Sequence, residues 1–516
     1  MIHRDEEKLK PQAWNGVHVT HRTTVERLYD VDNVGADKAL LSGMEMFREA
    51  GRSLDQLIGE ARSKGAKRVL AIGSGWALSD INITDGWLVN TKLLNGCYDV
   101  GDRYFHDDYP AERRPFVVLA QGGMQIAELN AYLELIPQHV SKKRAIKAAG
   151  IGNGQTIAGA VSGNTHGSQL TFGAMPDFVV GLHIATGSGR TLWIERASRP
   201  VLNDDFVAEL GAEAIRDDAI FNAAVVSFGT FGIIAAMAIE TDPIYHLEFG
   251  PIGDIHHDDL KAKLLRFGKG ETGDLYHYEF IFDPHGRKQM AMEAGAPKKP
   301  YEDGVDTPKP RWIIRDKNGF APGINILRVA GLLRFLPPRI PTSFQFSQYR
   351  KLALLNEVRG APGQLYTSSI YYLEGYTESA FGVSVLDAPA TIDICSQVCR
   401  RIGLPSISQV RLARASGATL GFTRHEPITA VFEFGLINDK SFTELEAEID
   451  SAFRKAGIRY TMHWSKNSGI DPVKLDYMYG PERIASWKEA RSAVFKNDSA
   501  LMALFETRAM KRAGLA

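Results

Sequence analysis

Residues 150–167 are rich in glycine and in hydroxyl side chains, a composition suited to binding a large, flat ligand. Six of these positions are glycine, and Thr156, Ser162 and Thr165 carry hydroxyls. Because glycine has no Cβ, the backbone can approach a ligand closely, and successive amide N–H groups can form a concave site for a pyrophosphate. The run therefore predicts a dinucleotide site, with a string of tight turns between strands as the alternative.

A second glycine loop lies earlier in the chain. Residues 68–72 have the pattern of a buried strand, which leads directly into Gly73-Ser74-Gly75-Trp76. A strand that ends in such a turn is typical of a loop that holds a phosphate. Neither loop has the Gly-x-Gly-x-x-Gly or Gly-Lys-Ser/Thr pattern, which argues against a Rossmann domain and a P-loop.

Together the two loops and the motifs around them resemble the FAD-binding half of the vanillyl-alcohol oxidase superfamily, a PCMH-type domain. The further matching motifs are Thr84-Asp85-Gly86, Gly122-Gly123, Gln155–Gly159, Thr165-His166-Gly167 and Ser227–Ile234. Near the C-terminus, His463-Trp464-Ser465-Lys466, followed by Tyr479-Gly480, Trp487 and Arg491, is similar to the aldonolactone and alditol oxidase branch. The resemblance implies an α+β, two-domain flavoenzyme with a PCMH-type FAD-binding domain and an α+β substrate (cap) domain.

The resemblance also implies which residues contact FAD. They are Ala71, Ile72, Gly73, Ser74, Gly75, Trp76, Ala77, Thr156, Gly159, Gly163, Asn164, Thr165, His166 and Ile233. Many relatives have histidine in place of Trp76 and attach FAD through it. Tryptophan has no nucleophilic nitrogen for that bond, and His166 and Cys97 are poor substitutes, so we expect FAD to be bound non-covalently.

Gln409 and Arg411 are two residues apart on a predicted strand, which places both side chains on one face. The aldonolactone branch has Glu-x-Arg here, and the resemblance implies that Arg411 stabilises an oxygen anion or reduced flavin. Gln409 can orient a substrate hydroxyl, but an amide cannot accept its proton at neutral pH.

Two further residues are candidates for the chemistry. Glu433 is a lone carboxylate in an apolar strand, and it is either the general base or a solvent-facing residue of a one-sided strand. Lys466 corresponds to a lysine that related oxidases use beside the flavin or substrate, where an ammonium offsets negative charge. An ungapped comparison places Lys92 near a position linked to oxygen access, where a long side chain would hinder oxygen.

The resemblance implies oxidation of a CH–OH group by hydride transfer to flavin N5, with O2 or another acceptor taking the electrons. A small alcohol, a polyol or a sugar lactone would be the substrate, and loss of the family's glutamate makes an aromatic or alicyclic alcohol credible. One alternative is a 2-hydroxy-acid dehydrogenase, with Arg414 or Arg424 holding the carboxylate. The other is a flavin-binding protein without turnover.

Composition supports a small-molecule enzyme. The 516 residues are 44% hydrophobic, enough for two cores, and 60 Lys and Arg balance 61 Asp and Glu, so no overall field favours nucleic acid or an anionic membrane. No membrane span is expected, because no apolar run reaches about 18 residues. The polar N-terminus and the three cysteines, which cannot form a disulfide framework, fit a cytoplasmic protein. His256-His257-Asp258-Asp259 is interpreted as a solvated loop, with no metal site.

Periodicity predicts the elements that must position these residues. Helices are expected at 40–61, 124–135, 388–401 and 442–456, and strands at 69–72, 116–120, 178–185, 232–239 and 276–282. The pattern changes after Pro243, which predicts an FAD-binding domain at 1–243, a cap at 244–465 and a return to the FAD domain at 466–516. The Pro-rich, basic segment 297–341 could be a lid or a membrane-surface patch, but its prolines favour a packed loop.

Overall fold

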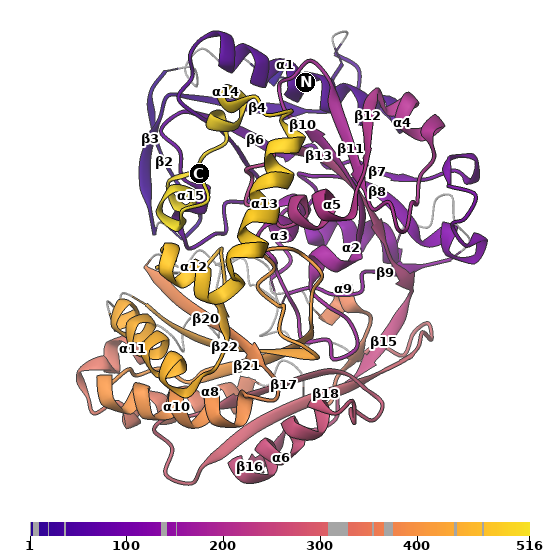
Figure 1. Cartoon of the computed structure of the whole chain (residues 1–516). Helices are drawn as coiled ribbons and strands as arrows, with labels where there is room; N and C mark the ends of the chain where they lie inside the picture. The colour runs from indigo at the N-terminus through magenta and orange to yellow at the C-terminus, as the bar shows by residue number, and fades with distance from the viewer. Residues whose placement is uncertain are drawn as a thin grey trace.

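The computed structural model has two lobes, with the N-terminal half of the chain in one and most of the remainder in the other (Figure 1). It describes residues 2–3, 10–18, 20–35, 38–135, 142–150, 152–307, 329–352, 356–365, 375–437, 441–466 and 469–516. Helices and strands alternate irregularly along the chain. The α+β prediction is therefore confirmed.

The first sheet of the N-terminal lobe carries the first glycine loop. Its strand order is β1 (Ile2–His3), β4 (Arg27–Asp32), β6 (Trp87–Leu93) and β5 (Val69–Ile72). β4 and β5 both run parallel to β6, and β5 ends where the Gly73 loop begins. β2 (Gln12–Asn15) and β3 (Arg22–Val25) form a separate hairpin beside it.

A six-stranded sheet completes this lobe among the described residues. Its order is β12 (Ala212–Arg216), β11 (Thr191–Glu195), β10 (Val179–Ala185), β13 (Ile233–Glu240), β8 (Val117–Gln121) and β7 (Cys97–Asp99). α1 (Gly43–Ser63) contacts β4 of the first sheet and β10, β11 and β13 of the second. Its buried apolar residues, among them Phe47, Leu54 and Ile58, recur at helical spacing. Burial of these side chains against the two sheets holds the helix in place. α2 (Ile126–Leu135), α3 (Ile157–Ser162), α4 (Asp204–Leu210) and α5 (Asp218–Ala224) are the other helices of this part.

The second lobe is built on one large antiparallel sheet. Its order is β19 (Arg359–Gly360), β15 (Tyr245–Glu248), β18 (Met290–Pro300), β17 (Leu275–Phe282), β21 (Ser408–Arg414), β22 (Ile428–Ile437), β20 (Tyr376–Ser384) and β23 (Tyr460–Met462), with β16 (Gly253–His256) also paired to β18. α6 (His257–Gly268), α10 (Ala388–Ile402) and α11 (Ser441–Ala456) pack on one face. α8 (Arg339–Leu352) and α9 (Pro362–Leu365) complete the described helices of this lobe.

Alternation along β21 and β22 separates the two faces of this sheet. Val410 and Phe432 are paired across the strands and belong to the same apolar core as Cys395 and Phe453 of the covering helices. Gln409, Arg411 and Glu433 therefore point to the opposite face, which α6, α10 and α11 leave uncovered. This is the face from which the candidate chemistry must act.

The C-terminal helices return to the N-terminal lobe, where they are drawn in yellow in Figure 1. They are α12 (Pro472–Tyr479), α13 (Pro481–Val494), α14 (Ser499–Leu504) and α15 (Arg508–Ala513). α13 packs on α5, and Arg512 forms a two-point ion pair with Asp80 at 2.6 and 2.8 Å. β14 (Asp242–Pro243) pairs with β9 (Arg144–Ala145), whereas β15 joins the large sheet. The domain boundaries at 243 and 465 stay a prediction.

The sequence 256–259 is not a loop. His256 ends β16 and caps α6, where its Nδ1 accepts a hydrogen bond from the Asp258 amide at 3.3 Å. The sequence prediction missed this cap because histidine is not among the preferred N-cap residues. Among the described residues, no three His, Cys, Asp or Glu side chains are grouped as metal ligands.

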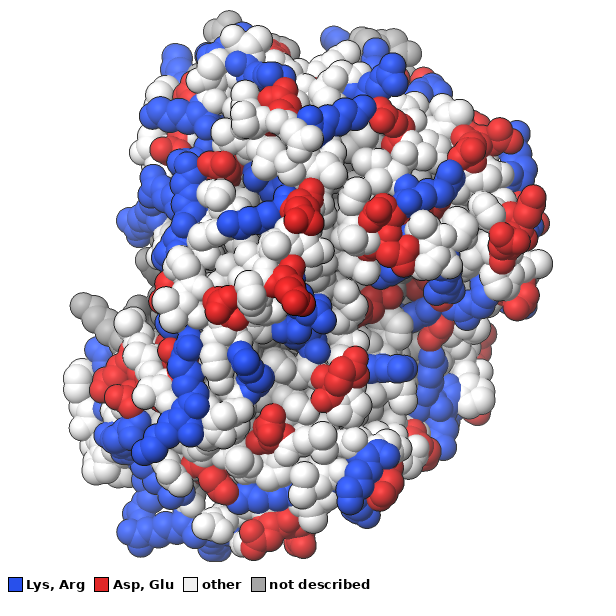
Figure 2. Space-filling view, in the orientation of Figure 1, with Lys and Arg blue, Asp and Glu red and all other residues white. Residues whose placement is uncertain are grey.

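Charge is distributed without a dominant sign. Figure 2 shows Lys and Arg interspersed with Asp and Glu over the visible face, on both lobes. The chain has 60 cationic and 61 anionic residues, and on this face the two kinds are mixed rather than separated.

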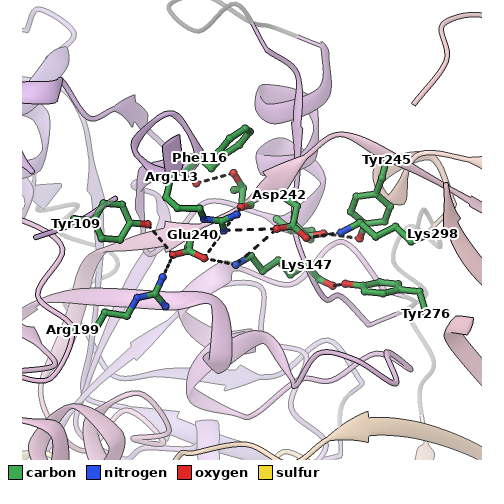
Figure 3. A network of polar contacts seen from close by, with 12 residues as sticks. Tyr109, Arg113, Phe116, Lys147, Arg199, Glu240, Asp242, Tyr245, Tyr276 and Lys298 are labelled. Carbon is green, nitrogen blue, oxygen red and sulfur yellow. Dashed lines mark hydrogen bonds and ion pairs between the residues drawn. The ribbon is translucent and has the colours of Figure 1, made fainter. Parts of the chain in front are cut away.

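A buried carboxylate marks the point where the chain leaves the N-terminal lobe. Glu240 ends β13 and contacts Arg113, Lys147, Arg199 and Tyr109 (Figure 3), with Arg199 Nη2 at 2.6 Å and the Tyr109 hydroxyl at 2.8 Å. Burial works to raise its pKa, but Lys147 and the other donors outweigh burial and lower it to about 2. Glu240 therefore offsets the positive charges of Arg113, Lys147 and Arg199, which would otherwise repel one another.

The same network extends into the cap through Asp242. Lys298 of β18 bonds Asp242 Oδ2 at 2.6 Å and lies over the rings of Tyr245 and Tyr276, 4.0 and 5.0 Å from their centroids. The Tyr276 hydroxyl donates to the Lys147 carbonyl at 2.6 Å. These contacts join the two lobes directly where the chain crosses between them.

We expect Glu240→Gln to lower stability by about 2 to 4 kcal/mol at pH 7, because three cations lose their shared counter-charge. A carboxyl with a depressed pKa stabilises the fold above its unfolded pKa, and this contribution is lost as pH falls toward about 2. The urea unfolding midpoints of wild type and Glu240→Gln should therefore differ at pH 7 and converge toward pH 3. Asp303→Asn, which removes an exposed partner of Lys143, is the matched control. Equal midpoints for wild type and Glu240→Gln at pH 7 would refute the assignment.

Candidate active site

The predicted FAD-binding segments lie against one another. A Cβ on Gly73 would lie 2.0 Å from Thr156 Oγ1, and one on Gly163 would lie 2.3 Å from Ser465 Oγ. The Leu78 amide donates to the Ser465 carbonyl at 2.8 Å. Glycine is therefore required where the first loop, the second glycine run and the residue before Lys466 meet.

Trp76 lies in this cradle and fits a non-covalent cofactor. Its ring approaches Gly152, where a Cβ would lie 2.7 Å from Cζ3. Its indole Nε1 is buried and has no hydrogen-bond partner among the described residues, and the same holds for His166 Nε2. Buried polar groups are normally hydrogen-bonded, so these unpartnered atoms and the glycine cradle suit the polar edges of a bound FAD.

The other predicted FAD residues surround this cradle in different ways. Ala71 and Ile72 end β5, and Ser74 Oγ accepts a hydrogen bond from Gln125 at 3.2 Å. Ala77 is half-buried in the first loop and Gly159 is exposed in α3. Thr165 donates to Gln155 Oε1 at 3.3 Å, and Ile233 is buried at the start of β13.

The Asn164 side chain contacts the cap. Its Oδ1 accepts from the Phe422 and Thr423 amides, and its Nδ2 donates to Thr423 Oγ1 at 3.3 Å. The side chain thus holds the end of the glycine run to a cap loop, and its φ of 59° is tolerated because asparagine adopts left-handed backbone more readily than most residues.

Arg411 and Glu433 form a two-point ion pair on the uncovered face of the cap sheet. Arg411 Nε and Nη2 lie 2.7 and 2.6 Å from the two Glu433 oxygens. Arg411 Nη1 also donates to the His166 carbonyl at 3.3 Å. The predicted charge-stabilising cation is therefore connected directly to the predicted FAD-binding run.

Lys466 joins this pair to a second carboxylate. Its Nζ bonds Glu433 Oε1 and lies 2.8 Å from Glu378 Oε1. Glu378 comes from β20, which is paired with β22 so that Ala380 is opposite Glu433. Sequence reasoning missed Glu378, because it follows Tyr376-Thr377 in a polar stretch with no lone-charge signal.

Gln409 lies beside a third carboxylate. Its Nε2 donates to Glu279 Oε2 of β17 at 3.4 Å, and His277 Nε2 lies 3.6 Å from the same oxygen. Glu279 is opposite Arg411 in the strand pairing, and Gln409 is opposite Glu433. The neighbouring strand thus supplies a carboxylate beside the glutamine that replaces the family's glutamate.

The surroundings push the pKa values of the two carboxyls around Lys466 apart. Burial favours the neutral acid at both, but the charges and hydrogen bonds of Arg411 and Lys466 hold the pKa of Glu433 well below its usual range. The pKa of Glu378 is raised, because burial and the charge of Glu433 outweigh its contact with Lys466. Glu433 is therefore a permanent counter-charge and Glu378 a titratable group, which argues against the prediction of Glu433 as general base. Glu433 is also buried, so it is not solvent-facing.

His166 and His463 are neutral at pH 7. Burial, together with Arg411, lowers the pKa of His166 to about 3, and burial and Lys466 hold the pKa of His463 well below its usual value. Arg411 and Lys466 are therefore the cations of this group at neutral pH. Tyr376, which has a pKa raised well above its usual value by burial and by Glu378, stays a hydrogen-bond donor.

Three other sequence candidates lie away from this group. Arg414 is exposed at the end of β21, and Arg424 donates to the Met478 carbonyl at 2.6 Å and lies over the Tyr479 ring. Neither is placed to hold a carboxylate beside Arg411. Lys92 is exposed near the end of β6, and its link to oxygen access stays a prediction.

We expect acid precipitation to release all of the flavin into the supernatant, because Trp76 occupies the position of the attaching histidine. His18, in edge contact with Trp76 at a ring distance of 6.1 Å, is an alternative nucleophile beside this loop. A yellow pellet that becomes colourless in His18→Ala would show a covalent bond there instead. The absorption spectra of pellet and supernatant decide between the two.

Comparisons with known proteins agree with this geometry. Residues 52–195 match the FAD binding domain family, a range that contains the Gly73 loop and the second glycine run. The chain is 26% identical over 262 residues to an L-gulono-1,4-lactone dehydrogenase of Mycobacterium tuberculosis, covering 50% of this chain and 49% of that protein. It is 28% identical over 269 residues to a D-arabinono-1,4-lactone oxidase of Candida albicans, covering 50% and 41%. The match thus spans about half the length of these curated relatives, or less.

Solved structures share the whole architecture. A cholesterol oxidase from Brevibacterium sterolicum superposes with a TM-score of 0.68 at 14% identity, over 98% of this chain and 97% of that chain. At this identity the likeness concerns the fold alone. The comparisons agree with a two-domain α+β fold, with an FAD binding domain within residues 52–195 and with a resemblance to lactone-oxidising enzymes.

Proposed function

We propose that this protein is an FAD-dependent oxidoreductase that oxidises a CH–OH group of a small, polyhydroxylated substrate such as a sugar lactone or polyol. The observation that carries this proposal is the contact of Arg411 with the His166 carbonyl, which joins a charged sheet face to the FAD-binding run. The named activities of the lactone-oxidising relatives support it. FAD, when bound, supplies a hydride acceptor at N5.

The chain must remove the proton of the substrate hydroxyl, and Glu378 suits this task. A general base works best when its pKa is near the working pH, and Glu378 has the raised pKa while Glu433 is held ionised. Lys466, 2.8 Å from Glu378 Oε1, can donate to the substrate oxygen and stabilise its developing charge. Arg411 supplies a second fixed positive charge.

Substrate class follows from the chemistry of the face. Gln409, Glu279, Glu378 and Tyr376 are half-buried hydrogen-bonding groups rather than apolar ones. An apolar alcohol bound against these groups would exclude water from them without offering hydrogen bonds in return, at a cost of about 1 to 3 kcal/mol for each polar group affected. A ligand with several hydroxyls satisfies them, which favours a polyol or lactone over an aromatic or alicyclic alcohol.

The test is anaerobic addition of polyols, aldonolactones, alicyclic alcohols and 2-hydroxy acids to the FAD-loaded protein. We expect a polyol or lactone to bleach the flavin spectrum, and its deoxy analogue at the reacting carbon to leave it unchanged. Admitting O2 afterwards distinguishes an oxidase, which reoxidises at once, from a dehydrogenase that needs another acceptor. Bleaching by a 2-hydroxy acid alone would contradict the proposed substrate class.

We expect Gln409→Glu to retain FAD but to change the pH dependence of flavin reduction. The new carboxyl would lie beside Glu279, and repulsion between the two would raise its pKa into the working range. Flavin reduction measured by stopped flow across pH should then show an additional ionisation. A profile identical to wild type would remove Gln409 from the reacting face.

A further inference from the structure

Exposed apolar side chains are concentrated in one short part of the cap. Twelve large hydrophobic residues are exposed among the described residues, and five of them lie within residues 329–340. Phe335 is 84% exposed, Leu332 77%, Ile340 44% and Leu336 42%. Leu332 and Leu336 flank the 3-10 turn Leu333–Phe335, which contains Phe335, and Ile340 lies in the first turn of α8, which is drawn low in Figure 1 beside α10. The prediction of a packed loop is wrong for this part of segment 297–341, while residues 308–328 lie outside the described residues.

Cationic residues accompany these side chains. Residues 329–352 contain Arg334, Arg339, Arg350 and Lys351 and no Asp or Glu, although Arg350 is paired with Asp254 of β16. The Arg334 guanidinium lies 4.9 Å from the Phe335 ring centroid, so its charge is held beside exposed apolar surface. Pro337, Pro338 and Pro341 keep the segment from forming one continuous helix. We call Leu332, Phe335, Leu336 and Ile340, with Arg334 and Arg339, the cap patch.

We propose that the cap patch docks this protein on an anionic lipid surface. Clustered apolar side chains can enter the interface while the adjacent arginines pair with lipid phosphates. A second copy of the chain fits less well, because a two-fold contact would bring the arginines of one cap patch against those of the other. None of the described helices is long and apolar enough to span a bilayer.

The test is sedimentation of the FAD-loaded full chain with vesicles of phosphatidylcholine alone or with a third phosphatidylglycerol. We expect binding to the mixed vesicles that weakens as salt rises. Leu332→Asp with Phe335→Asp should lower the bound fraction about tenfold or more, and Arg334→Gln with Arg339→Gln about tenfold. Leu40→Asp with Val473→Asp is the matched control, because those side chains are 81% and 69% exposed outside the cap patch.

Flavin content and thermal midpoint establish that each variant is folded. The proposal would be overturned if wild-type protein bound neither vesicle type, or bound both equally. Unchanged binding by the Leu332→Asp and Phe335→Asp double variant would also overturn it. A dimer that dissociates in this double variant, without vesicle binding by wild type, would assign the cap patch to a second copy instead.

Discussion

Replacing Glu378 with glutamine is expected to slow flavin reduction by about 10²- to 10⁴-fold, with FAD still bound. Burial and the charge of Glu433 raise the pKa of Glu378, so it can accept a proton from a substrate hydroxyl. Because the base must be ionised, wild-type reduction should accelerate as pH rises through its pKa, and the Glu378→Gln rate should be flat there. Anaerobic stopped flow across pH measures both.

Glu293→Gln is the matched control for this experiment. Glu293 is opposite Phe280 and bonds Lys263 of α6 at 2.7 Å, so it lies on the other face of the same sheet. Its replacement should leave the pH profile unchanged. A Glu378→Gln protein with the wild-type rate and profile would place the base elsewhere.

Replacing Arg411 with glutamine should cost about 3 to 5 kcal/mol of stability, because it leaves a buried carboxylate with fewer partners. Glu433 is 4% exposed and loses both of its guanidinium contacts. Flavin reduction should fall by about 10²- to 10³-fold, since a fixed positive charge is lost from the reacting face. Urea unfolding and anaerobic stopped flow give the two quantities.

The double variant Arg411→Gln with Glu433→Gln separates structure from chemistry. Two amides can hydrogen-bond without an unpaired buried charge, so stability should largely return. Activity should not return, because the cation is still absent. Recovery of the rate would show that Arg411 serves only to neutralise Glu433.

Local patterns in the sequence were sufficient for most of the scaffold. The helix predicted at 40–61 is α1 at Gly43–Ser63, and the strand predicted at 276–282 is β17 at Leu275–Phe282. These elements have regular apolar spacing over two or more turns or pleats, which is the signal that sequence carries best. The resemblance then supplied the order of the FAD-binding motifs.

Contacts between strands could not be derived in the same way. Glu279 is a lone acid in an apolar strand, the same signal that identified Glu433, but only the register of β17 with β21 places it beside Gln409. The assignment of Glu433 likewise depended on Arg411, which lies on the neighbouring strand. Exposure of Leu332 and Phe335 was equally hidden, because an apolar run gives no sign of whether anything covers it.

Hydride transfer from a substrate carbon is the central claim, and isotopic substitution at that carbon tests it most directly. The measurement is the anaerobic rate of flavin reduction with the best polyol or lactone, unlabelled and deuterated at the reacting CH–OH. We predict reduction that is several-fold slower with the deuterated substrate, in wild type and in Glu378→Gln alike. A flavin that photoreduces normally but is reduced by no hydroxyl-bearing compound would contradict the account and favour a flavin-binding protein without turnover.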